Sequence, residues 1–248
     1  MTFVALEGAA SATELLAWSP PGWGATLVWG LWNTILIALG AYALGLFIGI
    51  LGAFGKLYGG PILKDLLAVY TTLVRAVPEL VLLLLITFAA KDAINSVLRL
   101  NGYDPIDFSG VVAGIIVLGV VQGAYSTEVL RGAIQSVPAG QIEAARAMGM
   151  SPMLLARRVT LPLMASSAVP GLANLWLTVT KDTALLAVIG FIELTKATSL
   201  AAATTKQFLI FYLAGGVLYL LLSLVSGQVF GRIEKWARRG QRHTGGGI

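Results

Sequence analysis

Long uninterrupted apolar segments constrain this chain more than any other feature. A helix that crosses a bilayer needs about 20 mostly apolar residues in succession. Because lipid offers no water to unpaired backbone amides, only helices and closed barrels can span it. Barrel strands alternate apolar and polar residues, and these segments show no such alternation. The five predicted spans are residues 25–54, 66–90, 109–130, 168–192 and 207–230.

Composition supports the same fold class. The 248 residues are 57% hydrophobic and only 12% charged, whereas a soluble domain carries about 25% charged residues. We therefore expect an all-α, polytopic membrane protein with about five transmembrane helices. The net charge of +5 does not indicate a nucleic-acid partner, since in a membrane protein the position of each charge matters more than the sum. The chain has no Cys, and its single His, His243, lies in a polar tail, so no metal site and no cofactor are expected.

Basic residues concentrate in alternate loops, which predicts the orientation. Cytoplasmic loops carry an excess of Lys and Arg, and here that excess follows the first and third spans and the last one. The N-terminus is therefore expected outside, and the C-terminus in the cytoplasm, of a multi-pass protein of the inner (plasma) membrane. The first basic residue is Lys56, so no cleaved signal peptide is expected. The expected division is an extracytoplasmic tail at 1–24, a membrane domain at 25–230 and a basic tail at 231–248.

The segment after the third span, residues 131–165, is too long and too rich in helix formers for an ordinary loop. Residues 139–148 are mostly good helix formers. Gly149 should end that helix, and Ser151 with Pro152 suits the start of a second helix that runs to Pro162. The segment is thus expected to form a helical hairpin on the cytoplasmic face. It could rest on lipid headgroups or present a docking surface to a cytoplasmic partner.

One motif in this hairpin is specific. It reads Glu143-Ala144-Ala145, three residues, Gly149, nine residues, then Val159-x-Leu161-Pro162. It resembles the EAA motif of ATP-binding-cassette importer permeases, with Val159 in place of Ile. The resemblance implies a coupling helix that seats in a groove of a separate ATPase subunit. Alanines allow close approach, a Glu can pair with a partner Arg, and a Gly makes the turn. The implied coupling residues are Glu143, Ala144, Ala145, Gly149, Leu161 and Pro162.

The flanking segments resemble the polar amino-acid permeases, most closely the histidine, lysine–arginine–ornithine and opine permeases. The resemblance covers roughly residues 25–240 and rests on such stretches as 123–125, 181–185 and Arg75 before Pro78. Asp182 departs from the family, in which a small hydroxyl residue is common after the Lys. The resemblance implies a non-catalytic permease subunit that imports polar or basic amino acids or related opines. The implied partners are ATPase subunits, a second permease subunit in a homo- or heterodimer, and an extracytoplasmic solute-binding protein.

No phosphate-binding loop accompanies these features. Such a loop requires Gly-Lys followed by Ser or Thr, whereas Gly55-Lys56 is followed by Leu57. ATP hydrolysis is therefore expected on another chain. One alternative is a secondary transporter, although no convincing internal repeat is present. The other is an intramembrane enzyme: a single His excludes H-E-x-x-H, and only a Ser/Lys pair using Lys181 stays open.

Charged residues inside the spans are candidates for a substrate path. Each costs about 2.5–3.5 kcal/mol at mid-bilayer on insertion scales. Arg75 and Glu79 are four residues apart, so on one helix they would share a face and pair. Glu128, near the predicted cytoplasmic end of its span, has room to snorkel or cap, and for it structural pairing between spans is favoured over a place in a substrate path. Structural pairing and a path for a zwitterionic amino acid both stay open for the others. The substrate-path candidates are Arg75, Glu79, Asn174, Lys181 and Asp182.

Glycines recur four residues apart within two of the spans. The pairs are Gly45 with Gly49, residues 110 with 114, and Gly119 with Gly123. Small residues let helix backbones approach closely in lipid. We expect these glycines to pack helices rather than to bind a ligand.

Overall fold

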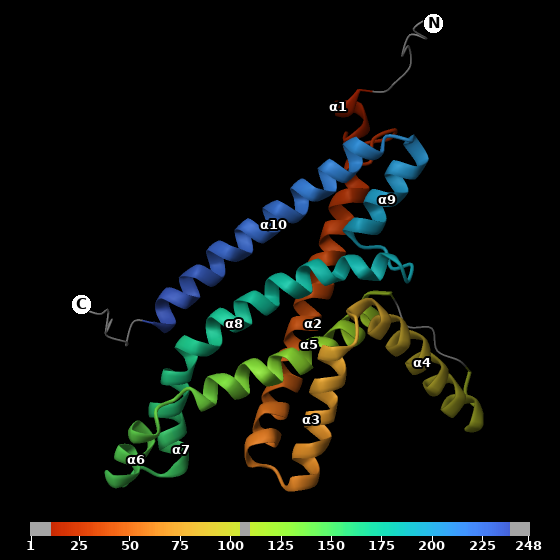
Figure 1. Cartoon of the computed structure of the whole chain (residues 1–248). Coiled ribbons are helices and arrows are strands. Elements are labelled where there is room, and N and C mark those ends of the chain that lie inside the picture. Colours follow the sequence, from red (N-terminus) through yellow and green to blue (C-terminus); the bar gives the residue numbers. More distant parts are fainter. Residues whose placement is uncertain (1–10, 105–109, 239–248) are drawn as a thin grey trace, which may run out of the picture.

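The computed structural model describes residues 11–104 and 110–238, and within these ranges it contains helices and no strand (Figure 1). The predicted all-α fold class is therefore confirmed. Parts of both predicted tails, including His243, lie outside the described residues. The main helices are α1 (Ala12–Leu15), α2 (Gly24–Tyr58), α3 (Pro61–Ala76), α4 (Glu79–Leu100), α5 (Gly110–Gln135), α6 (Ala139–Ala147), α7 (Pro152–Leu155), α8 (Leu161–Asp182), α9 (Leu194–Thr205) and α10 (Phe208–Ala237). A π-helical turn (Ala156–Thr160) precedes α8, and a 3-10 turn (Thr183–Ala187) follows it.

Four helices in the described part of the chain are long and apolar enough to cross a membrane. They are α2, α4, α5 and α10. Helices α2, α5 and α10 contain most of the predicted spans 25–54, 109–130 and 207–230. The prediction of a polytopic helical membrane protein is thus confirmed.

The predicted span 66–90 is wrong as a single helix. The chain leaves helical geometry at Val77, with φ −95° and ψ 139°, so α3 ends at Ala76 and α4 begins at Glu79. The cause is Pro78, which lacks an N–H and pushes the residue before it into an extended conformation. The break also corrects the expectation for Arg75 and Glu79, which lie on two helices and not on one helix face.

The bounds of the predicted span 168–192 also change. Helix α8 begins at Leu161 and ends at Asp182, and the 3-10 turn follows it. It is not among the four apolar helices, because Ser, Thr, Asn, Pro and Gly residues dilute its apolar ones. Even so, its 22 residues run from the α6–α7 hairpin toward α9 (Figure 1). At 1.5 Å per residue its length is about 33 Å, close to the thickness of a hydrocarbon core.

Helices α2 and α5 form the centre of the fold, and glycines bring them close together. A Cβ added at Gly49 would lie 2.4 Å from Ser126 Cβ, and one added at Gly52 would lie 2.3 Å from Thr127 Oγ1. Because real Cβ atoms almost never approach another atom this closely, only the hydrogen of a glycine fits at these two positions. Cβ atoms at Gly119 and Gly123 would likewise collide with side chains of α2. The predicted packing role of these glycines is confirmed.

A buried carboxylate holds the end of the molecule where α1, α9 and the first residues of α2 and α10 gather (Figure 1). Glu193 is 0% exposed and caps α9, accepting backbone N–H bonds from Thr195 and Lys196 at 2.8 Å each. It also accepts the hydroxyl of Tyr219 in α10 at 2.9 Å and contacts Thr34 of α2. This end of the molecule lies opposite the end that carries the α6–α7 hairpin (Figure 1).

Candidate functional site

The α6–α7 hairpin is built from local sequence signals. Helix α6 ends at Ala147, and Gly149 takes the left-handed conformation with φ +76°. Its N–H donates to Arg146 O at 2.9 Å, and the N–H of Met150 donates to Ala145 O at 3.2 Å. These two bonds form a Schellman motif, in which a glycine is strongly favoured. The predicted role of Gly149 as the helix stop is confirmed.

The second arm of the hairpin begins as predicted but does not end at Pro162. Ser151 Oγ accepts the N–H of Leu154 at 3.4 Å, and Pro152 occupies the first turn of α7. The chain then continues through the π-helical turn into α8, with Pro162 in the first turn of that helix. A proline ring clashes with the carbonyl four residues earlier in a regular α-helix, and the wider π turn before Pro162 relieves that crowding. The expected end at Pro162 is wrong.

One face of the hairpin is anchored to the rest of the molecule. Ala145 is 5% exposed. Ile142 packs on an apolar cluster that includes Ala133 near the end of α5, Val137 just beyond that end, and Met164 of α8. The hairpin is therefore packed firmly against the adjoining ends of α5 and α8.

The other face of the hairpin is open. The side chains of Glu143 and Ala144, as well as Gly149, are exposed. Met148 is 80% exposed and Met153 is 77% exposed at the tip. Exposed apolar side chains grouped beside a polar rim are typical of protein-interaction surfaces. Of the remaining coupling candidates, Leu161 is exposed and Ala145 faces inward.

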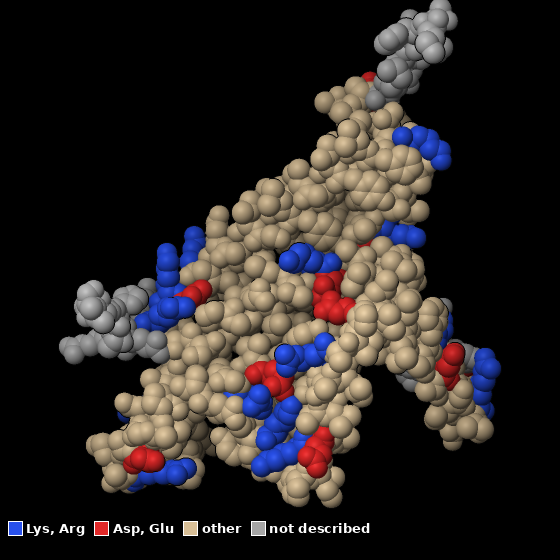
Figure 2. All heavy atoms as spheres, viewed as in Figure 1, with Lys and Arg blue, Asp and Glu red and all other residues tan. Residues whose placement is uncertain are grey.

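A second group of candidate residues meets where α4, α5 and α8 converge. Glu79 is the first residue of α4 and Asp182 the last of α8. The carboxylate of Glu79 acts electrostatically on both Asp182 and the hydroxyl of Tyr125 in α5, so these three groups are near neighbours. Figure 2 shows acidic and basic side chains near the middle of one face, with further charged side chains below them and a mostly uncharged surface above. Two carboxylates from separate helices thus lie side by side.

Three other substrate-path candidates lie around this pair. Arg75, near the end of α3, is exposed, and its positive charge interacts electrostatically with the hydroxyl of Tyr125. Lys181 is exposed beside Asp182, and Asn174 is exposed two turns earlier on α8. The structure therefore brings Glu79 and Asp182 together, with the charge of Lys181 acting on Asp182 and that of Arg75 acting on the neighbouring Tyr125. Tyr125 was not among the candidates, although it belongs to the 123–125 stretch that carried the family resemblance.

These features define a class of protein: a polytopic helical membrane protein that presents an anchored helical hairpin with one open face. Residues 41–239, most of the chain, match the family described as binding-protein-dependent transport system inner membrane component. The chain belongs to this family. It is therefore a membrane subunit of a transport system, and the predicted family is confirmed.

Named relatives and solved structures agree with this assignment. The chain is 42% identical over 230 residues to the nopaline transport system permease protein NocQ of Agrobacterium fabrum, covering 92% of this chain and 98% of that protein. It is 39% identical over 214 residues to the histidine/lysine/arginine/ornithine transport system permease protein HisQ of Escherichia coli, covering 86% and 94%. A crystal structure of an amino acid ABC transporter with histidines matches with a TM-score of 0.73 at 27% identity, covering 86% of this chain and 95% of that one. An inward-facing structure of the MetNI methionine ABC transporter matches with a TM-score of 0.73 at 21% identity, covering 89% and 100%, and supports the fold.

Proposed function

We propose that this chain is the permease subunit of an ATP-driven importer for polar or basic amino acids or related opines. Its partners in this proposal are ATPase subunits on the cytoplasmic side, a second permease subunit and an extracytoplasmic solute-binding protein. The permease itself performs no chemistry. It converts movement of the ATPase subunits into alternating exposure of a substrate path.

The hairpin is the observation that carries this proposal. A docking element must be rigidly joined to the membrane helices on one side and free on the other. The buried Ala145 face is joined to α5 and α8, while Glu143, Ala144 and the two Met side chains are free to meet a partner. The hairpin exposes Arg146, Arg157 and Arg158, and such a basic rim also suits lipid headgroups. Glu143, an acidic residue on the exposed side of α6, does not suit them and favours a protein partner.

The carboxylate pair supports the substrate class. Two carboxylates side by side repel each other in a medium where charge is costly. A cationic group between them removes that repulsion, and an amino-acid substrate offers one in its ammonium group or basic side chain. Arg75 presents a planar fork that suits the substrate carboxylate. We assign Lys181 and Asn174 to the same path on α8. The names of the relatives, which include histidine, lysine, arginine and ornithine, agree with a cationic substrate.

Reconstitution tests the proposed function. The purified permease complex, with its ATPase subunits and binding protein, is placed in liposomes and supplied with labelled arginine. We expect uptake that requires ATP and the binding protein together. Uptake that needs only an ion gradient would identify a secondary transporter. Absence of ATP-dependent uptake for every basic and polar amino acid and opine tested would reject the proposal.

The orientation is part of the proposal. Excess Lys and Arg after α2, in the hairpin and after α10 puts these segments in the cytoplasm. Residues 1–24 then form an extracytoplasmic tail, 25–230 the membrane domain with its coupling segment at 131–165, and 231–248 a cytoplasmic tail. The polarity of α8, which joins the hairpin to the α9 end, suits a helix that crosses the bilayer inside the assembly and away from lipid (Figure 1).

Reporter fusions check this orientation. Alkaline phosphatase folds only outside the cytoplasm, so a fusion after Arg239 should be inactive. A fusion after Lys206, between α9 and α10, should be active, because α10 then crosses back to the cytoplasm. Activity after Arg239, or its absence after Lys206 in a stably inserted chain, would contradict the arrangement.

A further inference from the structure

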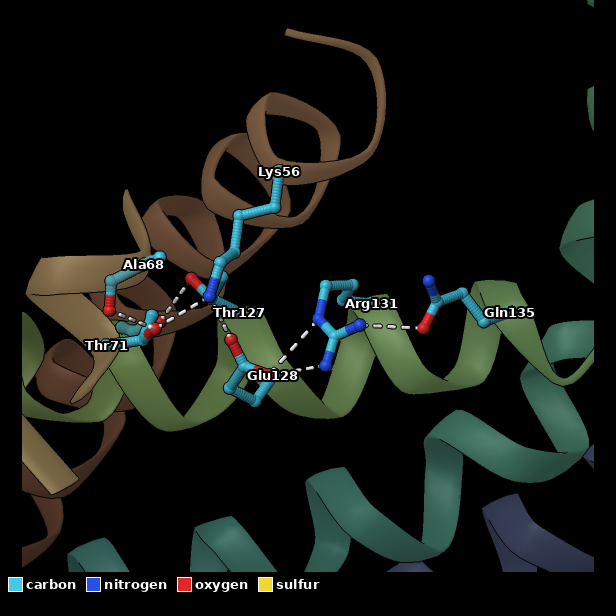
Figure 3. A network of polar contacts seen from close by, with 8 residues as sticks. Lys56, Ala68, Thr71, Thr127, Glu128, Arg131 and Gln135 are labelled. Carbon is cyan, nitrogen blue, oxygen red and sulfur yellow. Dashed lines mark hydrogen bonds and ion pairs between the residues drawn. The ribbon is translucent and has the colours of Figure 1, made fainter. Parts of the chain in front are cut away.

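Glu128 is bonded to cations from two helices. Its Oε1 accepts Lys56 Nζ of α2 at 2.5 Å, and its Oε2 accepts Arg131 NH2 of the next turn of α5 at 2.8 Å (Figure 3). Structural pairing between spans, the role favoured for Glu128 from the sequence, is therefore confirmed. Lys56, which follows the predicted span 25–54, lies in the last turn of α2 and not in a loop.

The contacts extend from this carboxylate in two directions. Lys56 Nζ also donates to Thr71 Oγ1 of α3 at 2.8 Å, and Arg131 NH1 donates to Gln135 Oε1 at 2.7 Å (Figure 3). We refer to Lys56, Thr71, Glu128, Arg131 and Gln135 as the Glu128 network. It joins α2, α3 and α5.

The network is held in a closely packed setting. The side chains of Lys56 and Glu128 are 14% and 17% exposed, so salt and water screen their attraction only partly. Beside them, Gly52 lets the backbone of α2 approach Thr127 of α5. A partly buried ion pair of this kind is strongly disturbed when one partner is removed, because the other charge is left uncompensated.

The network lies between the hairpin and the substrate-path candidates. Gln135 is the last residue of α5, and α6 begins at Ala139. At the other end, Thr71 lies one helical turn before Arg75 on α3. A displacement of the hairpin that moves the end of α5 must therefore either carry α3 along through Lys56 or break the network.

We infer that the Glu128 network is a positioning device that transmits movement of the hairpin to α3 and Arg75. The inference rests on the proposed function, since it assumes that the hairpin receives movement from an ATPase. Glu128 and Lys56 touch neither ATP nor substrate in this scheme. Their loss weakens the connection between hydrolysis and transport and leaves both sites in place.

The test measures transport and ATP hydrolysis in the same reconstituted complexes. Glu128→Gln and Lys56→Gln are each expected to lower the amount of substrate moved per ATP hydrolysed about tenfold, a common size for coupling between sites. The rate of hydrolysis should stay within about twofold of the original. The double variant should be no worse than either single one, since both remove the same link. Thr71→Val, which removes only one hydrogen bond, should give a smaller loss in the same direction and guards against a Glu128 variant that fails to fold.

A matched control is available on α10. Glu234 and Arg238 form an ion pair at 2.8 Å, four residues apart, and are 35% and 55% exposed. Glu234→Gln should leave transport per ATP unchanged. A parallel fall of thermal stability, hydrolysis and transport in the Glu128 network variants would show a purely structural role and overturn the inference. If Glu128→Gln moves the normal amount of substrate per ATP hydrolysed while hairpin variants abolish uptake, the inference fails and the proposed function stands. If hairpin variants also transport normally, the proposed function fails.

Discussion

Reversing the charge at the open face of the hairpin, by Glu143→Lys, should abolish ATP-driven uptake while the chain still inserts and folds. Glu143 is exposed on α6, so the substitution leaves the internal packing of the permease intact. A lysine there would repel a basic groove on the ATPase and lose the charge-assisted bond that Glu143 offers. Unpairing one charge in an interface costs about 2–5 kcal/mol, which corresponds to a fall in assembly between roughly 30-fold and several thousand-fold. Uptake and recovery of the ATPase with the purified permease measure the effect.

A matched reversal separates docking from the loss of a negative charge. Asp65→Lys changes an exposed acidic residue of α3, outside the hairpin and on the side proposed to be cytoplasmic, and it should leave uptake within about twofold of the original. Gly149→Val should repeat the Glu143→Lys defect, since a β-branched residue is strained at φ +76° and the turn between α6 and α7 would distort. An assembled Glu143→Lys complex that transports normally would remove the hairpin from the coupling interface.

The second large effect is expected at the carboxylate pair. Glu79→Gln together with Asp182→Asn should lower uptake of lysine or arginine on the order of 100-fold, since hydrogen bonds to charged groups contribute about 1.5–3 kcal/mol each. The chain should fold normally, because removing two neighbouring like charges relieves repulsion. Hydrolysis of ATP should persist, since Asp182 lies at the end of α8 that is farther from the hairpin. Competition between labelled arginine and a neutral amino acid measures the change in selectivity.

Asp104→Asn serves as the control for this pair. Asp104 is exposed after the end of α4 and has no part in the convergence of α4, α5 and α8. Its neutralisation should leave arginine uptake unchanged. A Glu79→Gln, Asp182→Asn complex that still prefers arginine over neutral amino acids would exclude the pair from the substrate path and restrict the candidates to Arg75, Asn174 and Lys181.

Local signals in the sequence were sufficient to predict the hairpin. Gly149, Ser151 and Pro152 act on the backbone within a few residues, and each takes the predicted position in a cap or turn. The glycine pairs were equally informative, because close helix approach in lipid requires small side chains. The span count was less certain, since hydropathy alone does not reveal that α8 passes between other helices.

Two prolines had different effects, and sequence did not distinguish them. Pro78 separates α3 from α4, so the assumed face shared by Arg75 and Glu79 does not exist. Pro162 sits inside a continuous helical path, because the π turn before it makes room for the ring. Whether a proline breaks or bends a membrane helix depends on packing around it.

Long-range contacts account for the remaining differences. Lys56 and Glu128 are 72 residues apart in the chain, so neither could be recognised as the other's partner. Glu193 directly follows the predicted span 168–192, yet it is fully buried and joins α2, α9 and α10. In both cases a charged residue near the end of an apolar segment has its partners inside the protein, which hydropathy does not reveal.

Cross-linking from the hairpin tests the central claim most directly. The chain contains no cysteine, so Ala144→Cys provides a single attachment point for a photoreactive group on the exposed face of α6. Leu209→Cys, on a residue 74% exposed at the start of α10 and at the opposite end of the molecule, is the matched control (Figure 1). In complexes that transport, illumination should join the permease to the ATPase from position 144 and not from position 209. An active complex that gives no ATPase adduct from position 144, or equal adducts from both positions, would contradict the assignment of the hairpin as the coupling element.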